Sequence, residues 1–404
     1  KELKAEVILY GDNYDESYIE AQRLSKERKL SFIHPFNDPE VIAGQGTIGV
    51  ELLSQLKDPP DAIYVAVGGG GLIAGISIYI KNLWPTTKII GIEPEDADAM
   101  TRSLKEKKII ELDNVGLFAD GVAVKKVGKL TFEIAKQYVD KMITVNTDEI
   151  CAAIKDVFED TRSILEPAGA LSIAGMKKDI IEGKFVELNL VAIACGANMN
   201  FERLRFVAER AELGEYKEAM LAVEIPEKAG SLIDLCKLLK ERNLTEFSYR
   251  MSNSQNAQIF IGLQVNGLED KELLIDEFNE SKYKFIDISN DELSKNHLRH
   301  MVGGRLPSGF TNSNKNNLIE ILYRFEFPER PGALMKFLKS MKPDWSISVF
   351  HYRNHGADVG RIVIGVLINQ NYIEDWYKFV NDLGYKYWDE SNNKTYKLFL
   401  GASD

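Results

Sequence analysis

The chain has 404 residues, of which 45% are hydrophobic and 27% charged, and its net charge at neutral pH is −11. This length predicts about two to four domains, and the apolar fraction is ordinary for a globular protein with a full core. The negative charge argues against a nucleic-acid partner, and no apolar run reaches the roughly 18 residues that a membrane helix needs. The three cysteines and five histidines form neither a disulfide framework nor a metal-binding signature, so no metal site is predicted.

Residues 1–200 alternate short β-rich runs with helical patterns. The expected strands are Ala5–Tyr10, Ala62–Val67, Lys88–Glu93, Met142–Val145 and Leu188–Ala194. The expected helices between them include Ser17–Lys26, Gly46–Leu56, Leu72–Leu83 and Asp148–Ile164. Several of these strands are continuously apolar, as strands covered on both faces are, so the alternation predicts a parallel α/β sheet.

From about residue 218 the order changes to β-α-β-β-α-β, which is the ferredoxin-like topology. Four segments of this part recur at a shift of 102 or 103 residues: Pro226–Gly230 as Pro328–Gly332, Phe247–Arg250 as Phe350–Arg353, Gly262 as Gly365, and Tyr283–Phe285 as Tyr385–Tyr387. Four matches at nearly one offset, in the same order, predict a duplicated domain. Residues 303–317 between the copies are polar and rich in turn-forming residues, so they are predicted to be a linker.

Four consecutive glycines, Gly68–Gly71, follow the expected strand Ala62–Val67 and open an apolar helix. Backbone N–H groups of such a loop can close around a phosphate, and the helix N-terminus adds partial positive charge. A plain turn explains the run less well, because each glycine costs backbone entropy. An alternative is a nicotinamide dinucleotide site with Glu93 as the ribose-binding acid, although the strict G-x-G-x-x-G form is absent.

Three further segments are candidates for a site. Cys195–Asn198 ends an apolar strand, where side chains of an α/β sheet face the ligand crevice, but a buried structural thiol is an equal alternative. Phe118–Val124 and Glu166–Ala170 place small residues at turns near expected sheet ends, which loop chemistry alone would explain. Glu166 taken alone is interpreted as a surface acid beside a helix.

Taken together, these segments resemble the biosynthetic threonine deaminases (threonine ammonia-lyases or dehydratases), which belong to the tryptophan-synthase-like, fold type II pyridoxal-phosphate enzymes. The resemblance runs through the chain in order and is carried by Pro35–Thr47, Val67–Leu72, Phe118–Val124, Cys151–Asp156, Glu166–Ala170, Gly196–Phe201, Phe325–Glu329 and Phe350–Gly356. It implies an α/β, parallel-sheet catalytic region over residues 1–216. It also implies two α+β, ACT-like regulatory domains of ferredoxin-like topology over residues 220–292 and 320–392.

The resemblance implies a lyase that uses pyridoxal 5'-phosphate to convert L-threonine to 2-oxobutanoate and ammonia in isoleucine biosynthesis. It assigns the cofactor phosphate to the loop of Gly68, Gly69, Gly70, Gly71 and Leu72. It places Cys195, a position that is commonly serine in the family, at the pyridine nitrogen, and Gly121 on the substrate side. The family's Schiff-base lysine lies before the segment where this chain starts, so we expect no catalytic lysine here and no activity from this chain alone.

The duplicated part suggests an effector site. In each copy a glycine, Gly230 or Gly332, opens the first helix beside a strand, where the carboxylate of an amino acid could bind. Candidate wall residues are Phe247, Tyr249, Phe350, Tyr352 and Arg353, although each aromatic taken singly is favoured as core. The resemblance implies isoleucine as inhibitor, with valine as a candidate activator.

The resemblance also implies a homotetramer, in the cytoplasm of a prokaryote or in the plastid or mitochondrial matrix of a eukaryote. Two alternatives stay open. One is a nicotinamide-dependent dehydrogenase with an amino-acid-binding regulatory tail, and the other is a non-catalytic amino-acid-binding fragment.

Overall fold

The protein is described from a computed structural model. The described residues are 5–11, 14–183, 187–228, 230–240, 242–251, 255–291, 293–295, 318–328, 333–342, 345–353 and 359–394. The chain divides into two compact units, Lys1–Glu215 and Tyr216–Asp404. The predicted linker, residues 303–317, lies outside the described residues, and so does Gly332.

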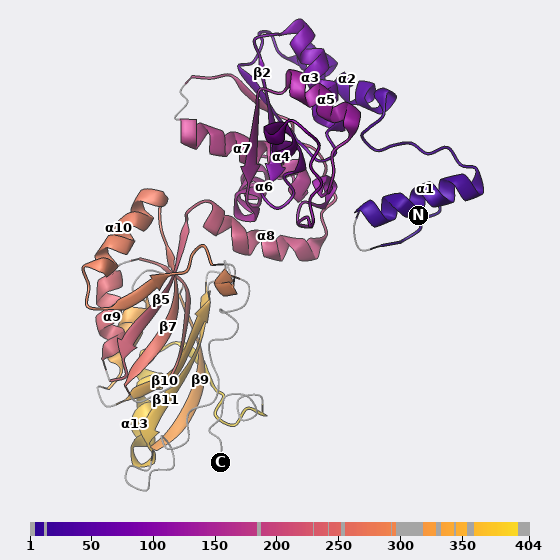
Figure 1. The fold of residues 1–404 in the computed structure, drawn as a ribbon. Coiled ribbons are helices and arrows are strands. Elements are labelled where there is room, and N and C mark those ends of the chain that lie inside the picture. Colours follow the sequence, from indigo (N-terminus) through magenta and orange to yellow (C-terminus); the bar gives the residue numbers. More distant parts are fainter. Residues whose placement is uncertain are drawn as a thin grey trace. The chain divides into compact units, whose positions relative to one another are not determined.

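The first unit is built on a four-stranded parallel sheet with the order β3-β2-β1-β4 (Figure 1). Its strands are β1 (Ala62–Ala66), β2 (Lys88–Pro94), β3 (Lys141–Val145) and β4 (Leu190–Ala192). Alternate residues of β1 enter two separate apolar cores, Tyr64 on one face and Ile63 on the other. Both faces of the sheet are therefore covered, which confirms the predicted parallel α/β arrangement and explains why the strands are continuously apolar.

Helices flank and connect the strands of this unit. They are α1 (Tyr14–Arg28), α2 (Pro39–Gln55), α3 (Gly71–Leu83), α4 (Ala99–Glu106), α5 (Lys129–Tyr138), α6 (Thr147–Thr161), α7 (Pro167–Gly183) and α8 (Phe201–Gly214), with a short 3-10 helix, η1 (Asp120–Val122). Local sequence explains where two of them begin. Asp38 accepts hydrogen bonds from the first backbone amides of α2, and Asn146 and Glu149 form a capping box at α6.

The expected strand Ala5–Tyr10 is not a strand in the structure, and this prediction was wrong. Its apolar side chains are exposed: Val7 is 63% and Leu9 is 92% accessible. A strand requires a hydrogen-bonded neighbour as well as suitable residues, and no described strand pairs with residues 5–10.

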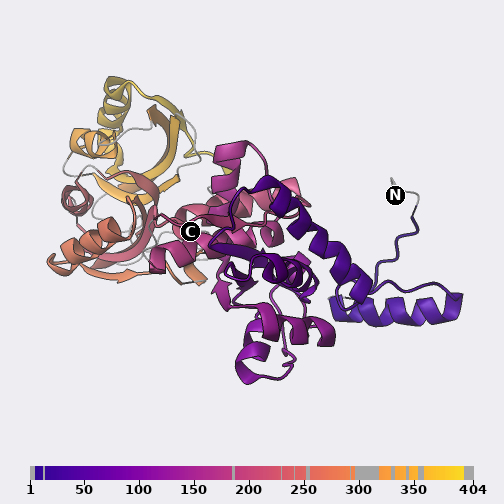
Figure 2. The same ribbon diagram turned by 90° about the horizontal axis from the view of Figure 1, so that it is seen from above.

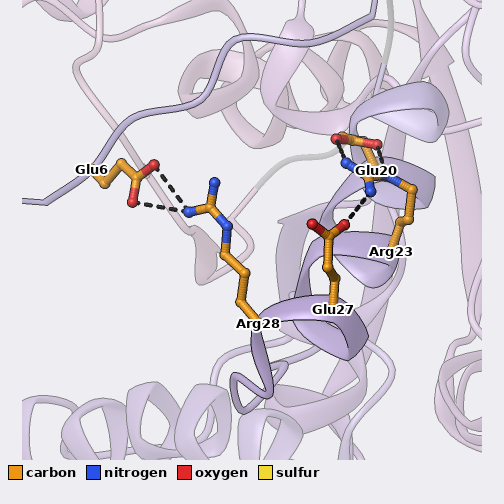
Figure 3. A network of polar contacts seen from close by, with 5 residues as sticks. All are labelled: Glu6, Glu20, Arg23, Glu27 and Arg28. Carbon is orange, nitrogen blue, oxygen red and sulfur yellow. Dashed lines mark hydrogen bonds and ion pairs between the residues drawn. The ribbon is translucent and has the colours of Figure 1, made fainter.

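Helix α1 has no buried residue, and the side chain of Arg23, which forms ion pairs within the helix, is 56% exposed. Arg23 forms ion pairs with Glu20 and Glu27 along the helix, while Arg28 reaches Glu6 at 3.0 Å (Figure 3). Figures 1 and 2 show α1 standing apart from the sheet of its unit. Exposed ion pairs of this kind contribute little to stability. The buried apolar residues of the unit lie around β1 and β2.

The second unit is one eight-stranded antiparallel sheet with the order β12-β9-β11-β10-β6-β7-β5-β8. The first repeat consists of β5 (Glu218–Pro226), α9 (Ser231–Leu239), β6 (Leu244–Arg250), β7 (Asn256–Gln264), α10 (Leu268–Asn279) and β8 (Lys284–Asp287). The second consists of β9 (Leu318–Pro328), α12 (Ala333–Ser340), β10 (Ser346–Arg353), β11 (Val359–Asn369), α13 (Ile373–Leu383) and β12 (Lys386–Asp389). The predicted β-α-β-β-α-β order thus occurs twice.

The two repeats meet where β6 pairs with β10, so that Tyr249 lies opposite Phe350 and Phe247 opposite Tyr352. The rings of Phe247 and Phe350 pack edge to face with their centroids 5.3 Å apart. Figure 1 shows α9, α10 and α13 on the same side of this sheet. One continuous apolar core, shared by both repeats, therefore lies at the seam between them.

Candidate functional site

A cavity of the first unit has a volume of about 560 Å³ and lies where β1 and β4 end. Its walls are Tyr14, Pro35, Phe36, Gln45, Ile48, Ala66, Gly68–Leu72, Asp120–Val124, Glu166, Ala168 and Ile193–Cys195. The carboxyl edge of a parallel sheet is the usual ligand crevice of such folds. The structure thus gathers three predicted elements around one space: the tetraglycine loop, Gly121 and Cys195.

The tetraglycine loop has a backbone that only glycine accommodates easily. Gly70 precedes α3 with φ at 93°, in the left-handed region. A Cβ at Gly69 would collide with the ring of Phe36, and one at Gly71 would lie 3.0 Å from the same residue. The carbonyl oxygen of Gly69 accepts a hydrogen bond from Oγ1 of Thr131 at 2.6 Å. The loop is therefore fixed by its surroundings and is not a loose turn.

The donors at this loop fit a phosphate group. Helix α3 begins at Gly71 and opens onto the cavity, and the first amides of a helix have no partner within it. Those amides and the positive end of the helix dipole favour an anion. The thiol of Cys195 is part of the same cavity wall. The space and its donors thus fit a small phosphorylated ring such as pyridoxal 5'-phosphate.

Cys195 follows β4 and is partly buried. Its Sγ lies 3.6 Å from the carbonyl oxygen of Ile193. Burial raises the pKa of the Cys195 thiol above its ordinary value, and the negative charge of Glu166 raises it further. At neutral pH the side chain is therefore a neutral thiol.

Glu166 also lines this cavity, whereas the sequence favoured a surface acid at this position. Its backbone amide donates to the carbonyl oxygen of Gly196 at 3.0 Å, and the amide of Cys195 donates to Gly169 at 3.2 Å. The amide of Asn198 donates to Oε2 of Glu166 at 3.1 Å. The Glu166–Ala170 and Cys195–Asn198 segments, which are distant in sequence, are thus joined by backbone hydrogen bonds.

Glu93 does not have the position that the dinucleotide alternative requires. It is completely buried and is not part of the cavity wall. Its carboxylate accepts hydrogen bonds from the amides of Met100 and Thr101, both at 2.8 Å, and from the Thr101 hydroxyl at 2.7 Å. Glu93 therefore accepts hydrogen bonds from the free backbone amides in the first turn of α4. It is not available as the ribose-binding acid that a nicotinamide-dependent dehydrogenase would need.

A second cavity, of about 300 Å³, lies in the second unit between the two repeats. Its walls are Ile225–Lys228, Gly230–Ile233, Tyr249, Leu338, Lys339, Met341, Lys342 and Trp345–Ile347. Of the predicted effector residues, Gly230 and Tyr249 line it. The others that are described lie in the core and not at the cavity: Phe247, Phe350 and Tyr352. The side chain of Arg353 lies outside the described part of the chain.

Two residues of this second cavity, Glu227 and Ser231, were not predicted from the sequence. The hydroxyl of Tyr249 bonds to Oε1 of Glu227 at 2.7 Å and to the carbonyl oxygen of Ile347 at 3.0 Å. Within the described residues, Oε2 of Glu227 and Oγ of Ser231 are buried without a hydrogen-bond partner. Burial also raises the pKa of Glu227. Gly230, with φ at 88°, precedes α9, so a helix N-terminus lies beside these groups.

The described residues contain no group of three or more histidine, cysteine, aspartate or glutamate side chains that could hold a metal ion. None of their helices has both the length and the hydropathy that a bilayer-crossing segment requires.

Comparisons with known proteins agree with this geometry. Residues 1–196 match the family of pyridoxal-phosphate dependent enzymes, and residues 209–298 and 312–400 match the C-terminal regulatory domain of threonine dehydratase. The chain is 51% identical to the biosynthetic L-threonine dehydratase of Burkholderia multivorans, over 98% of this chain and 76% of that protein. It is 48% identical to the mitochondrial threonine dehydratase of Schizosaccharomyces pombe, over 99% of this chain and 66% of that protein.

Among solved structures, the processed form of threonine deaminase isoform 2 from Solanum lycopersicum aligns with a TM-score of 0.51 and 49% identity. This alignment covers 52% of the present chain and 58% of the tomato chain. Both halves of the chain are thus matched to the same kind of protein. The chain belongs to the pyridoxal-phosphate-dependent threonine dehydratases that carry a C-terminal regulatory domain.

Proposed function

We propose that this chain carries the cofactor and effector sites of a threonine ammonia-lyase, which converts L-threonine to 2-oxobutanoate and ammonia in isoleucine biosynthesis. The observation that supports this most directly is the single cavity shared by the tetraglycine loop, η1 and Cys195. The identity to proteins named threonine dehydratase points to the same substrate. When bound, pyridoxal phosphate supplies an electron sink for the α-carbon of an amino acid.

The residues of this chain bind and orient the cofactor. The amides at the start of α3 would hold the phosphate, because the helix begins at the cavity wall and its first amides have no carbonyl partner within the helix. Cys195 offers a neutral thiol, and so provides a weak hydrogen bond and no charge. Gly121 lines the same cavity, where the substrate would bind beside the ring. The described cavity wall contains no lysine, so we expect pyridoxal phosphate to bind this chain without a covalent bond there.

Titration of the chain with pyridoxal phosphate, followed by cofactor fluorescence, tests the cofactor site. Pyridoxal, which lacks the phosphate, is the matched control ligand. We expect saturable binding of pyridoxal phosphate, at least about tenfold tighter than that of pyridoxal and competed by inorganic phosphate. Equal affinity for the two ligands would mean that surface lysines bind the aldehyde and that the loop does not hold the phosphate.

We further propose that the cavity of the second unit binds isoleucine as the regulatory ligand. The ligand's carboxylate would accept hydrogen bonds from Oγ of Ser231 and the first amides of α9, and its ammonium would face Glu227. The apolar side chain would contact Ile347, Trp345 and Met341. A volume of about 300 Å³ is small for a ligand site and suits one amino acid. Activation by valine and assembly into a homotetramer stay predictions.

Calorimetric titration of the chain with isoleucine tests the effector site. The matched control is the 2-oxo acid with the same carbon skeleton, which keeps the carboxylate and loses the ammonium. We expect heat from isoleucine and none from the oxo acid, because Glu227 would be left without its partner. Absence of heat at millimolar isoleucine would contradict the proposal. Binding of isoleucine without binding of pyridoxal phosphate would favour the alternative of a non-catalytic amino-acid-binding protein.

A further inference from the structure

Glu166 lies between two segments of the cofactor cavity. Its Oε2 accepts a hydrogen bond from the backbone amide of Asn198 at 3.1 Å. A Cβ at Gly196 would collide with Oε1 of Glu166, and a Cβ at Gly121 would lie 3.7 Å from the same atom. The carboxylate therefore fills the space that Gly196 leaves open, whereas the space beside Gly121 is closed by Cβ of Ala168, 2.9 Å from the position of a Cβ there.

The backbone beside Glu166 holds the same loop. The amide of Glu166 donates to Gly196, and the carbonyl oxygen of Gly169 accepts from the amide of Cys195. A Cβ at Gly169 would lie 2.6 Å from the carbonyl oxygen of Gly196 and 2.7 Å from that of Cys195, so the two segments are in close contact. We propose that Glu166 is the positioning residue that fixes the loop carrying Cys195 at the wall of the cofactor cavity. This inference rests on the cofactor site proposed above.

The charge of Glu166 gives it a second effect on the same sulfur. Burial is the larger cause of the raised pKa of Cys195, and the negative charge of Glu166 is the second cause. The other charged side chain among the described wall residues is Asp120, which pairs with Arg203 of α8 at 3.2 Å. Tyr14 is the remaining titratable group of the wall. Glu166 thus both holds the loop that carries Cys195 and adds to the increase in the pKa of its thiol, an electrostatic effect that a side chain that only filled space would not have.

Alkylation of Cys195 by iodoacetamide, measured by peptide mass spectrometry on the full chain without cofactor, reports both effects. Cys151 and Cys236 are buried and their thiol pKa values are raised, so they serve as slow internal references. Glu166→Gln keeps an acceptor for the Asn198 amide but removes the charge. We expect its pH profile at Cys195 to shift to lower pH and its rate at neutral pH to rise about three- to tenfold.

Glu166→Ala removes the hydrogen bond as well, so it should also raise the limiting rate at high pH, because the loop opens. The matched control is Asp120→Asn, which neutralises the other carboxylate of the wall and should leave the Cys195 profile unchanged. The inference is overturned if the Glu166→Gln profile coincides with the wild-type profile, or if Asp120→Asn shifts it equally. If the Cys195 profile shifts in Glu166→Gln but the wild-type chain does not bind pyridoxal phosphate, Glu166 still positions the loop, and the proposed cofactor site is wrong.

Discussion

Arg250 of β6 forms a buried ion pair with Glu320 of β9, although β10 and β11 lie between these strands. Only 4% and 3% of the two side chains are exposed. Gly365 of β11 keeps the path open, since a Cβ there would lie 2.7 Å from Oγ of Ser348 and 3.3 Å from Oε1 of Glu320. The pair therefore crosses the seam and joins the two repeats.

The repeated glycine at this place has the same physical cause in both copies. Gly262 of β7 is the counterpart of Gly365, and a Cβ there would lie 2.9 Å from Oε1 of Glu218. Each repeat thus has a glycine where a glutamate side chain passes over the sheet. The match of Gly262 with Gly365, seen first as a sequence repeat, reflects this close approach.

Removing one partner of the buried pair should destabilise the second unit strongly. Arg250→Leu leaves Glu320 buried without its cation, so we expect its free energy of unfolding to fall by about 3–5 kcal/mol. The double substitution Arg250→Leu/Glu320→Leu should recover much of this loss, because no unpaired charge remains. Urea unfolding followed by the fluorescence of the buried Trp345 and Trp376 measures both.

The matched control for this prediction is an exposed pair on the same sheet. Arg361 pairs with Glu326 at 3.3 Å, and its side chain is 62% exposed. Arg361→Leu should therefore cost at most about 1 kcal/mol. If Arg250→Leu cost no more than Arg361→Leu, the ion pair across the seam would not stabilise the unit.

Alanine in the tetraglycine loop should weaken cofactor binding. Gly70→Ala forces a left-handed φ on alanine and brings its Cβ within 2.7 Å of Met100 and 2.9 Å of Thr131. We expect an affinity for pyridoxal phosphate at least about tenfold lower, measured by fluorescence titration. Gly44→Ala is the control, since nothing lies within 4 Å of its Cβ in α2. It should bind normally and be slightly more stable; equal losses in both variants would contradict a specific role of the loop.

Isoleucine binding should weaken as the pH falls. Burial raises the pKa of Glu227 above its ordinary value of 4.5, so this carboxylate loses its charge at a higher pH than exposed glutamates do. Glu227→Gln should reduce the affinity about tenfold and abolish this pH dependence, as measured by calorimetry at mildly acidic and neutral pH. Glu224→Gln, in strand β5 just before Glu227 but outside the cavity, should behave as the wild type. An unchanged pH dependence in Glu227→Gln would remove Glu227 from the site.

Glu93 should make the stability of the first unit depend on pH. Burial raises its pKa to about 7, so the folded chain retains a proton there that the unfolded chain loses near its ordinary value of 4.5. Stability should therefore fall as the pH rises from 4.5 to 7, and this fall should disappear in Glu93→Gln. Urea unfolding at several pH values, followed by the fluorescence of Trp84, measures the free energy of unfolding of the first unit. The Glu95 side chain is 53% exposed, so Glu95→Gln should keep the wild-type dependence of stability on pH. If Glu93→Gln also kept the wild-type dependence, Glu93 would not be its cause.

The sequence predicted that the glycine loop and Cys195 lie at one sheet edge, because each follows an apolar strand and the carboxyl ends of parallel strands meet there; both line one cavity. It misjudged Glu166, whose partners Gly196 and Asn198 are distant in the chain and bond through the backbone. It also offered Glu93 as a ribose-binding acid, because spacing alone cannot show that the carboxylate turns to the first amides of α4.

The amino-acid sequence by itself determined the alternation of strands and helices from Ala62 onward, the duplication, and the positions that need glycine. These are local properties, set by the period of apolar residues and by the backbone freedom of single residues. Only the tertiary structure decided that Tyr249 lines the cavity of the second unit, while Phe247, two residues earlier on the same strand and in the same apolar core, does not reach it. It also decided that residues 5–10 form no strand. Burial and strand pairing depend on which distant segments meet, and that information is not contained in any one segment.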